Sequence, residues 1–138
     1  MAAERRGPRL LIVPAADRCL GWALRAANGR PLGVGVRTYR NEEELADAVR
    51  ELLIERAALR CSVGQSEGPS KGRQWAWAAY LPVRSTRPGA ADAVPVARSA
   101  RGYLRRDQCQ AGVEGFLAGL QWVGQELRRS GRDGRRPL

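Results

Sequence analysis

The sequence has 138 residues, a length that fits a single domain. Its 24 basic and 14 acidic residues give a net charge of +10, which favours polyanionic partners. Histidine is absent, which excludes the commonest general base and the commonest transition-metal ligand. The three cysteines form no C-x-x-C pair, so neither a zinc site nor a disulfide framework is indicated, and a reducing cytoplasm is the expected compartment.

The first residues predict a lead-in, a strand and a hairpin. Residues 1–9 are expected to be disordered. The apolar run that follows is a short strand, too brief for a signal peptide or a membrane span. The alternating stretch "CLGWALRA" and the stretch "PLGVGVR" then predict two strands around a two-residue Asn28-Gly29 turn.

Beyond Tyr39 the apolar spacing becomes helical. Asn41 is expected to cap this helix, with Glu44 as the second half of a capping box. The residues expected on its buried face are Leu45, Ala48, Val49, Leu52 and Leu53.

The second half repeats this order of three strands and a helix. Its predicted strands are "LRCSV", "QWAWAAYL" and "AVPVARS", and its helix is expected to start at Asp107. Counted from Tyr39 and Tyr103, apolar residues of the two halves recur at the same spacing, six, ten and thirteen positions later. We therefore predict a tandem repeat, with Trp22 and Trp75 at equivalent positions of a shared core.

The predicted fold class is α+β, with two three-strand-plus-helix repeats that share an antiparallel sheet and pack their helices on it. The first repeat spans residues 10–59. The second spans 60–127 and contains a loop insertion at 82–93. Residues 128–138 are expected to form a disordered basic tail. A monomer is expected, because the unit is already duplicated.

The stretch "WALRAANGRPLGVGVRTY", followed by a capped helix, resembles the YegP-like family of small proteins of unknown function. The resemblance implies an α+β fold in which repeats share a sheet, with single-repeat members forming the same unit as dimers. It supplies no catalytic residues. Arg37 and Arg101 stand where family members commonly have glutamate, which makes this chain more basic. The residues that carry the resemblance are Trp22, Leu24, Arg25, Ala26, Ala27, Asn28, Gly29 and Tyr39, with Trp75 and Tyr103 in the second half.

Catalytic chemistry is not indicated. The stretch "GQSEG" at 64–68 matches the G-x-S-x-G pattern of a hydrolase elbow, but that elbow requires a following helix and a histidine. Pairing Ser66 with Lys71 is weaker still, because a loop lysine is normally solvated. We expect no enzyme, no cofactor and no metal site.

The positive charge is unevenly distributed, which a uniform coding bias toward arginine does not produce by itself. Residues 41–56 hold six carboxylates, whereas 84–106 hold six arginines and 128–138 hold five. We predict that these arginines contact nucleic acid, mainly through phosphates. The candidates are Arg84, Arg87, Arg98, Arg101, Arg105, Arg106, Arg128 and Arg129.

Trp122 is a separate candidate for an interface. Helical spacing places it opposite the apolar stripe of the second helix, where it is exposed beside the basic tail. Alternatively, the helix bends near Gly119 and packs Trp122 against the sheet edge.

Two functions follow from the sequence. The first is a non-enzymatic module that binds nucleic acid through basic loops and the tail. The alternative is a protein–protein interaction or structural module in which the arginines provide only solubility.

Overall fold

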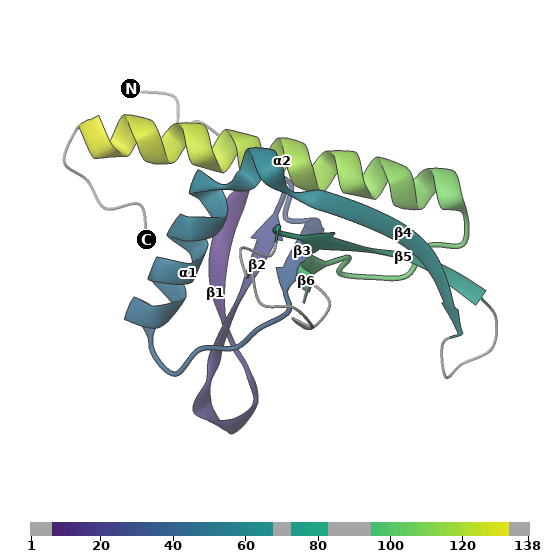
Figure 1. The fold of residues 1–138 in the computed structure, drawn as a ribbon, viewed down its shortest axis with the longest axis horizontal. Coiled ribbons are helices and arrows are strands. Elements are labelled where there is room, and N and C mark those ends of the chain that lie inside the picture. The colour runs from purple at the N-terminus through teal and green to yellow at the C-terminus, as the bar shows by residue number, and fades with distance from the viewer. Residues whose placement is uncertain (1–6, 68–72, 83–94, 133–138) are drawn as a thin grey trace, which may run out of the picture.

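The computed structural model describes residues 7–67, 73–82 and 95–132. Within these ranges, two α-helices pack on a six-stranded antiparallel sheet of order β1-β2-β3-β6-β5-β4, which confirms the α+β class (Figure 1). The elements are β1 (Arg9–Pro14), β2 (Leu20–Arg25), β3 (Pro31–Gly35), α1 (Glu42–Ile54), β4 (Arg60–Glu67), β5 (Arg73–Tyr80), β6 (Pro95–Arg98) and α2 (Arg106–Arg132).

The turn between β2 and β3 is one residue longer than predicted. Ala26 N–H donates to the Arg30 carbonyl, and Gly29 N–H donates to the Ala26 carbonyl. Among the three loop residues, only Gly29 has a positive φ, of 86°. This is the arrangement of a three-residue hairpin, in which the last loop position is left-handed and favours glycine. The Asn28 side chain instead accepts a hydrogen bond from Arg30 N–H.

Helix α1 begins as the sequence predicts. The Asn41 side chain accepts a hydrogen bond from Glu44 N–H at 2.8 Å, while the Glu44 carboxylate accepts one from Arg40 N–H. Three glutamates crowd the first turn, where the helix dipole favours negative charge. The residues of α1 that are buried are Leu45, Val49, Leu52 and Leu53.

Helix α2 is longer than predicted at both ends. It begins at Arg106 and continues to Arg132, so the first five residues of the predicted disordered tail, 128–132, are helical. Arginine is a good helix former, which permits this continuation. In Figure 1, α2 runs along the longest dimension of the molecule.

The core lies between one face of the sheet and both helices, and an aromatic group forms its centre. The Phe116 ring of α2 lies 4.6 Å from the Trp77 ring and 6.5 Å from the Trp22 ring, measured between centroids. All three side chains are buried. Trp75, predicted at the core position equivalent to Trp22, packs against the core but is half-buried, and Trp77 is the fully buried tryptophan of β5.

Glycine on β3 makes room for this aromatic group. A Cβ atom built on Gly33 would lie 2.6 Å from Phe116 Cδ1 and 2.9 Å from Trp77 Cη2. Contacts this short do not occur between real atoms, so no larger residue fits without displacing the rings. Glycine is unusual inside a strand, and in β3 Gly33 is explained by the space that its missing side chain leaves for the Phe116 and Trp77 rings.

The two halves of the sheet meet at a short junction between β3 and β6. Val34 pairs with Arg98 and Gly35 with Ala97, and one further hydrogen bond joins Val36 N–H to the Val96 carbonyl at 3.2 Å. Since Ala97 is fully buried toward the helices, Arg98 points to the opposite side of the sheet.

We predict that Phe116→Ala lowers the free energy of unfolding by about 3–5 kcal/mol, because it leaves a cavity in contact with both buried tryptophans. Leu104→Ala, at a side chain 81% exposed, is the control and is expected to change stability by less than about 0.5 kcal/mol. Urea unfolding followed by tryptophan fluorescence measures both. Equal effects of the two variants would contradict the central role of Phe116.

We predict that Asn41→Ala costs about 1 kcal/mol of stability, because it removes the acceptor for Glu44 N–H at the start of α1. Asn41→Ser retains an acceptor and is expected to keep most of the stability. Thermal unfolding by circular dichroism compares the variants, and a melting temperature unchanged in Asn41→Ala would show that the cap contributes nothing.

Candidate functional site

The side of the sheet away from the core, here called the open face, is the most extensive candidate surface. Neither α1 nor α2 covers it, because the core residues of both helices contact the other side. The strand register places one row of open-face residues straight across all six strands. From β1 to β4 this row is Leu11, Ala23, Val34, Arg98, Ala78 and Ser62.

Arginines occupy further positions of the open face. By alternation along the strands, Arg9, Arg25 and Arg60 lie on the same side as Arg98. All four are exposed. No acidic residue occupies an open-face position in the described strands.

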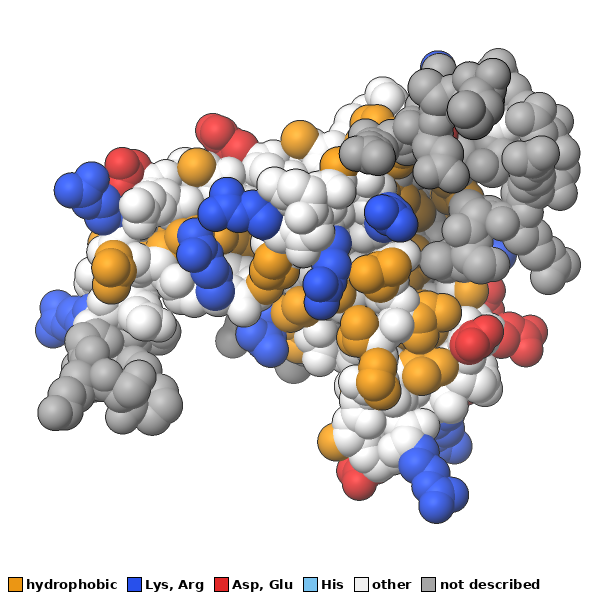
Figure 2. Space-filling view, turned by 180° about the vertical axis from the view of Figure 1, so that it is seen from behind, with side chains coloured by type: hydrophobic (Ala, Val, Ile, Leu, Met, Phe, Trp, Pro, Cys, Tyr) orange, Lys and Arg blue, Asp and Glu red, His pale blue; other side chains and the backbone are white. Residues whose placement is uncertain are grey.

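Aliphatic side chains form the floor between these arginines. Half-buried valines from β1, β3 and β6 and the exposed Leu11 lie at open-face positions. Figure 2 shows hydrophobic side chains gathered in the middle of one side of the molecule, with Lys and Arg among them and Asp and Glu at the margins. An apolar floor of this kind supports the stems of arginine side chains.

Acidic residues are concentrated in the helical layer. Apart from Asp17 and Glu67, the acidic residues of the described ranges lie on α1 and α2 or, for Glu55, directly after α1. Two of them form ion pairs within their own helices, Asp47 with Arg50 at 3.6 Å and Glu126 with Arg129 at 3.5 Å. The molecule therefore separates a cationic sheet surface from a mixed helical surface.

The structure distributes the arginines predicted from the sequence over three places. Arg98 lies at the centre of the open face, and Arg101, Arg105 and Arg106 lie at the connection from β6 to α2. Arg128 and Arg129 lie near the other end of α2, roughly 33 Å from Arg106 at the usual helical rise. These arginines do not form one surface. Arg84 and Arg87 lie outside the described residues.

Two of the arginines near the start of α2 pack on aromatic rings. The Arg106 guanidinium lies 5.8 Å from the centre of the Trp75 ring, and the Arg101 guanidinium lies 4.8 Å from that of Tyr103. A cation over an aromatic face is favourable. The helix dipole disfavours a cation such as Arg106 at the start of α2. The contact of Arg106 with Trp75, together with the nearby carboxylate of Asp107 in the first turn, offsets this cost.

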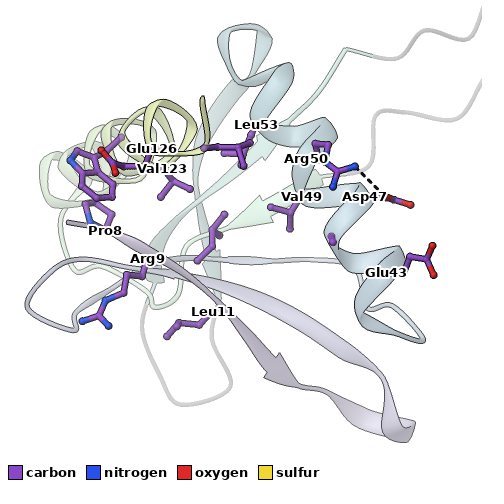
Figure 3. A pocket seen from close by; sticks show the side chains of 14 residues that line it. Pro8, Arg9, Leu11, Glu43, Asp47, Val49, Arg50, Leu53, Val123 and Glu126 are labelled. Carbon is purple, nitrogen blue, oxygen red and sulfur yellow. Dashed lines mark ion pairs between the residues drawn. The ribbon is translucent and has the colours of Figure 1, made fainter. Parts of the chain in front are cut away.

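Trp122 is half-buried and not free to act as an exposed platform. Its ring covers Gly7, which is buried and leaves no room for a Cβ atom. Of the two alternatives from the sequence, packing beside the edge of the sheet is therefore closer to the structure. Trp122 also lines a groove of about 880 Å³ between β1, α1 and the second half of α2 (Figure 3).

Candidate catalytic groups are not assembled in the described residues. Ser66 lies inside β4 and not at a strand-to-helix turn, so "GQSEG" does not form a nucleophile elbow. Lys71 lies outside the described residues. Burial raises the pKa of the Cys61 and Cys109 thiols, which lowers the thiolate fraction needed for nucleophilic attack. No group of three or more His, Cys, Asp or Glu residues suited to a metal occurs in the parts of the chain that are described.

Sequence reasoning missed Arg9, Arg25 and Arg60 as members of the site. Each lies at a strand end, and none belongs to a run of arginines. The alternation of side chains along each strand was the signal that could have found them. Each of the three arginines is an odd number of residues from a core-facing position in its own strand, which places it on the opposite face. Their convergence with Arg98 requires the register across all six strands, which one strand alone does not specify.

No helix in the described ranges is long and apolar enough to cross a membrane.

Comparisons with known proteins give one structural likeness. No known family matches the sequence, and no curated protein matches it. Among solved structures, the chain is similar to the NMR structure of UPF0339 protein SO3888 from Shewanella oneidensis. The TM-score is 0.56, over 83% of this chain and 86% of that chain. At 8% sequence identity the likeness shows the fold alone. UPF0339 is the YegP-like family, so this likeness agrees with the resemblance noted in the sequence.

Proposed function

We propose that this protein is a non-enzymatic module that binds nucleic acid through phosphate contacts made by the open face of its sheet. The observation that carries the proposal is the set of four open-face arginines without an acidic residue among them. Phosphate contacts of this kind supply affinity without base specificity. The basic surface is part of the folded sheet, which extends the sequence-based prediction of basic loops and a tail.

The register gives these arginines a regular arrangement. Arg25 and Arg60 lie on opposite sides of the row that contains Arg98, each two strands away and two residues along. With about 4.8 Å between strands and about 3.4 Å per residue, each lies roughly 12 Å from Arg98. Arg9, directly opposite Arg25 on β1, extends this diagonal stripe. Such a stripe of cations, in which Arg9 lies closer to Arg25 than the other arginines lie to one another, suits an extended polyanion.

The remaining predicted arginines belong to this proposal as secondary contacts. Arg101, Arg105 and Arg106 lie at the β6-to-α2 connection, and Arg128 and Arg129 lie at the far end of α2. A polyanion long enough to pass from the open face to either place gains affinity from them. We assign Arg84 and Arg87 the same role on sequence grounds alone.

We also propose that the chain is a tandem repeat and a member of the YegP-like family. Two isolated bridges support this: Leu20 pairs with Tyr39, and Trp75 pairs with Tyr103. Two residues beyond Leu20 and Trp75, the chain has its buried tryptophans, Trp22 and Trp77. The strand order, symmetric about the β3–β6 junction, agrees with two copies of one unit. The free cysteines favour a cytoplasmic location.

A protein partner on the same face is the second candidate function, and the aliphatic floor of the open face favours it. Contiguous exposed apolar surface commonly marks a protein interface. A partner that binds mainly through this floor has a weak dependence on salt, whereas phosphate contacts have a steep one. Salt dependence therefore separates the two candidates.

We predict that Arg25→Ser/Arg60→Ser/Arg98→Ser weakens binding of a fluorescein-labelled random 20-nucleotide single-stranded RNA or DNA at least ten-fold at 50 mM salt, by fluorescence anisotropy. The matched control, Arg18→Ser/Arg40→Ser/Arg50→Ser, removes the same charge from exposed positions off the open face. It is expected to weaken binding less than two-fold. Equal losses in both variants would show that net charge, and not the open face, binds the nucleic acid.

We predict a steep salt dependence for the wild-type protein on duplex DNA. Three to four phosphate contacts give a slope of about −3 to −4 in a plot of log affinity against log salt. The open-face variant is expected to reduce the magnitude of that slope by about three. No measurable binding to RNA, single-stranded DNA or duplex DNA at 50 mM salt would remove the proposal and leave the protein-partner candidate.

A further inference from the structure

Tyr80, the last residue of β5, places an aromatic ring among the aliphatic residues of the open face. Its two neighbours in the chain, Ala79 and Leu81, both pack in the core, and Ala79 is fully buried. Because side chains alternate along a strand, Tyr80 points to the opposite side. Tyr80 is half-buried, so part of the residue is in contact with solvent. Within the described strands, no other aromatic residue occupies an open-face position.

The strand register places Tyr80 between two of the open-face arginines. Tyr80 lies directly opposite Arg60 on β4, where the Cβ atoms of facing side chains are about 4.5–5.5 Å apart. On the other side, Arg98 of β6 pairs with Ala78, two residues before Tyr80. Such a diagonal neighbour lies roughly 8 Å away. Tyr80 therefore occupies the middle position of the stripe that runs from Arg98 to Arg60.

The other half of the stripe has no ring at the corresponding position. β2 and β5 are each second from an edge of the sheet. The residue of β2 that lies opposite Arg9 is Arg25, whereas the residue of β5 that lies opposite Arg60 is Tyr80. In the parts of the chain that are described, the contacts between rings and those between arginines and rings involve other aromatic residues. The ring of Tyr80 thus replaces a cation in the stripe and is not used in those contacts.

From this arrangement we propose that the ligand of the open face is single-stranded nucleic acid and that one of its bases stacks on Tyr80, while phosphates near that base contact Arg98 and Arg60. This inference rests on the proposed function and names the class of its ligand. Arginines alone bind the phosphates of single strands and of duplexes. An aromatic ring placed between them has a stacking partner only where the bases are unpaired, because duplex bases present only their edges in the grooves.

The alternative role for Tyr80 is to fill the floor of the open face beside the aliphatic residues. In that role, leucine is an adequate replacement, because it is also large and apolar. In the stacking role leucine is a poor replacement, because it has no flat ring, whereas phenylalanine retains one. Stacking accepts any base, because every base has a flat aromatic face. A homopolymer such as oligothymidine is therefore a suitable probe.

Fluorescence anisotropy with a fluorescein-labelled 20-nucleotide oligothymidine at 50 mM salt tests the proposal. Tyr80→Leu is expected to weaken binding at least five-fold, since it removes the ring. Tyr80→Phe is the matched control and is expected to change the affinity less than two-fold. Binding of a 20-base-pair duplex is expected to change less than two-fold in both variants. Equal affinities of the wild-type protein and Tyr80→Leu for oligothymidine would overturn the proposal.

A change of ligand tests the base contact even if Tyr80→Leu does not fold. The second probe is a labelled 20-unit DNA backbone in which every nucleotide is abasic. The wild-type protein is expected to bind oligothymidine at least five-fold more tightly than this backbone. Equal binding of the two probes would overturn the base contact and leave the phosphate contacts of the proposed function in place.

The salt dependence separates the ring from the arginines. Tyr80→Leu removes no charge, so the slope of log affinity against log salt on oligothymidine is expected to match that of the wild-type protein. Arg25→Ser/Arg60→Ser/Arg98→Ser is expected to reduce the magnitude of that slope. A slope in Tyr80→Leu as small as that of the arginine variant would show that Tyr80 acts only by positioning arginines, and would overturn the stacking role.

Discussion

The packing of Phe116 against Trp22 and Trp77 is the interaction on which the arrangement of this protein depends. Trp22 comes from β2 and Trp77 from β5, which lie on opposite sides of the β3–β6 junction. The junction itself has only two paired positions and one further hydrogen bond. The two halves are therefore joined more by α2, whose Phe116 contacts both tryptophans, than by the strand ladder. Gly33 permits this contact because it leaves space for the two rings.

The aromatic core lies on one face of the sheet, and this leaves the open face with residues of other types. The large buried side chains all face the helices, so apart from Tyr80 the open face has small or aliphatic residues and arginines. Because α1 and α2 carry most of the acidic residues of the described ranges, the four open-face arginines have no carboxylate among them on their side of the sheet. The same packing that forms the core thus gives the sheet a cationic surface.

Features set by neighbouring residues were predictable from the sequence, and features set by distant residues were not. The Asn41 cap depends on a hydrogen bond three residues away, and it was predicted correctly. The turn at Asn28-Gly29 was placed correctly but was one residue longer, since a preference for glycine does not specify the loop length. The end of α2 was placed too early because arginines were taken as a tail, although they are good helix formers.

The candidate site required information that only the assembled sheet contains. Arg98 was identified from its place in a run of arginines, whereas Arg25 and Arg60 join it through the register of strands distant in the sequence. Trp75 and Trp77 have the same facing in β5, so which of them is fully buried depends on the helix and strands that assemble around them and not on the alternation within β5. Trp122 was undecided from the sequence because its partner, Gly7, lies more than a hundred positions away.

The proposed binding of a polyanion to the open face would be linked to the stability of the fold through the β3–β6 junction. Arg25 belongs to the first half of the sheet and Arg60 to the second, with Arg98 on the junction strand β6. A polyanion that contacts all three spans the short ladder and holds the two halves in register. Since such a ligand binds the folded protein and not its separated halves, its binding free energy adds to that of folding, by RT ln(1 + [L]/Kd). Both the proposed ligand on the open face and the Phe116 packing on the other side of the sheet therefore hold the β3–β6 junction together, and both favour the folded state.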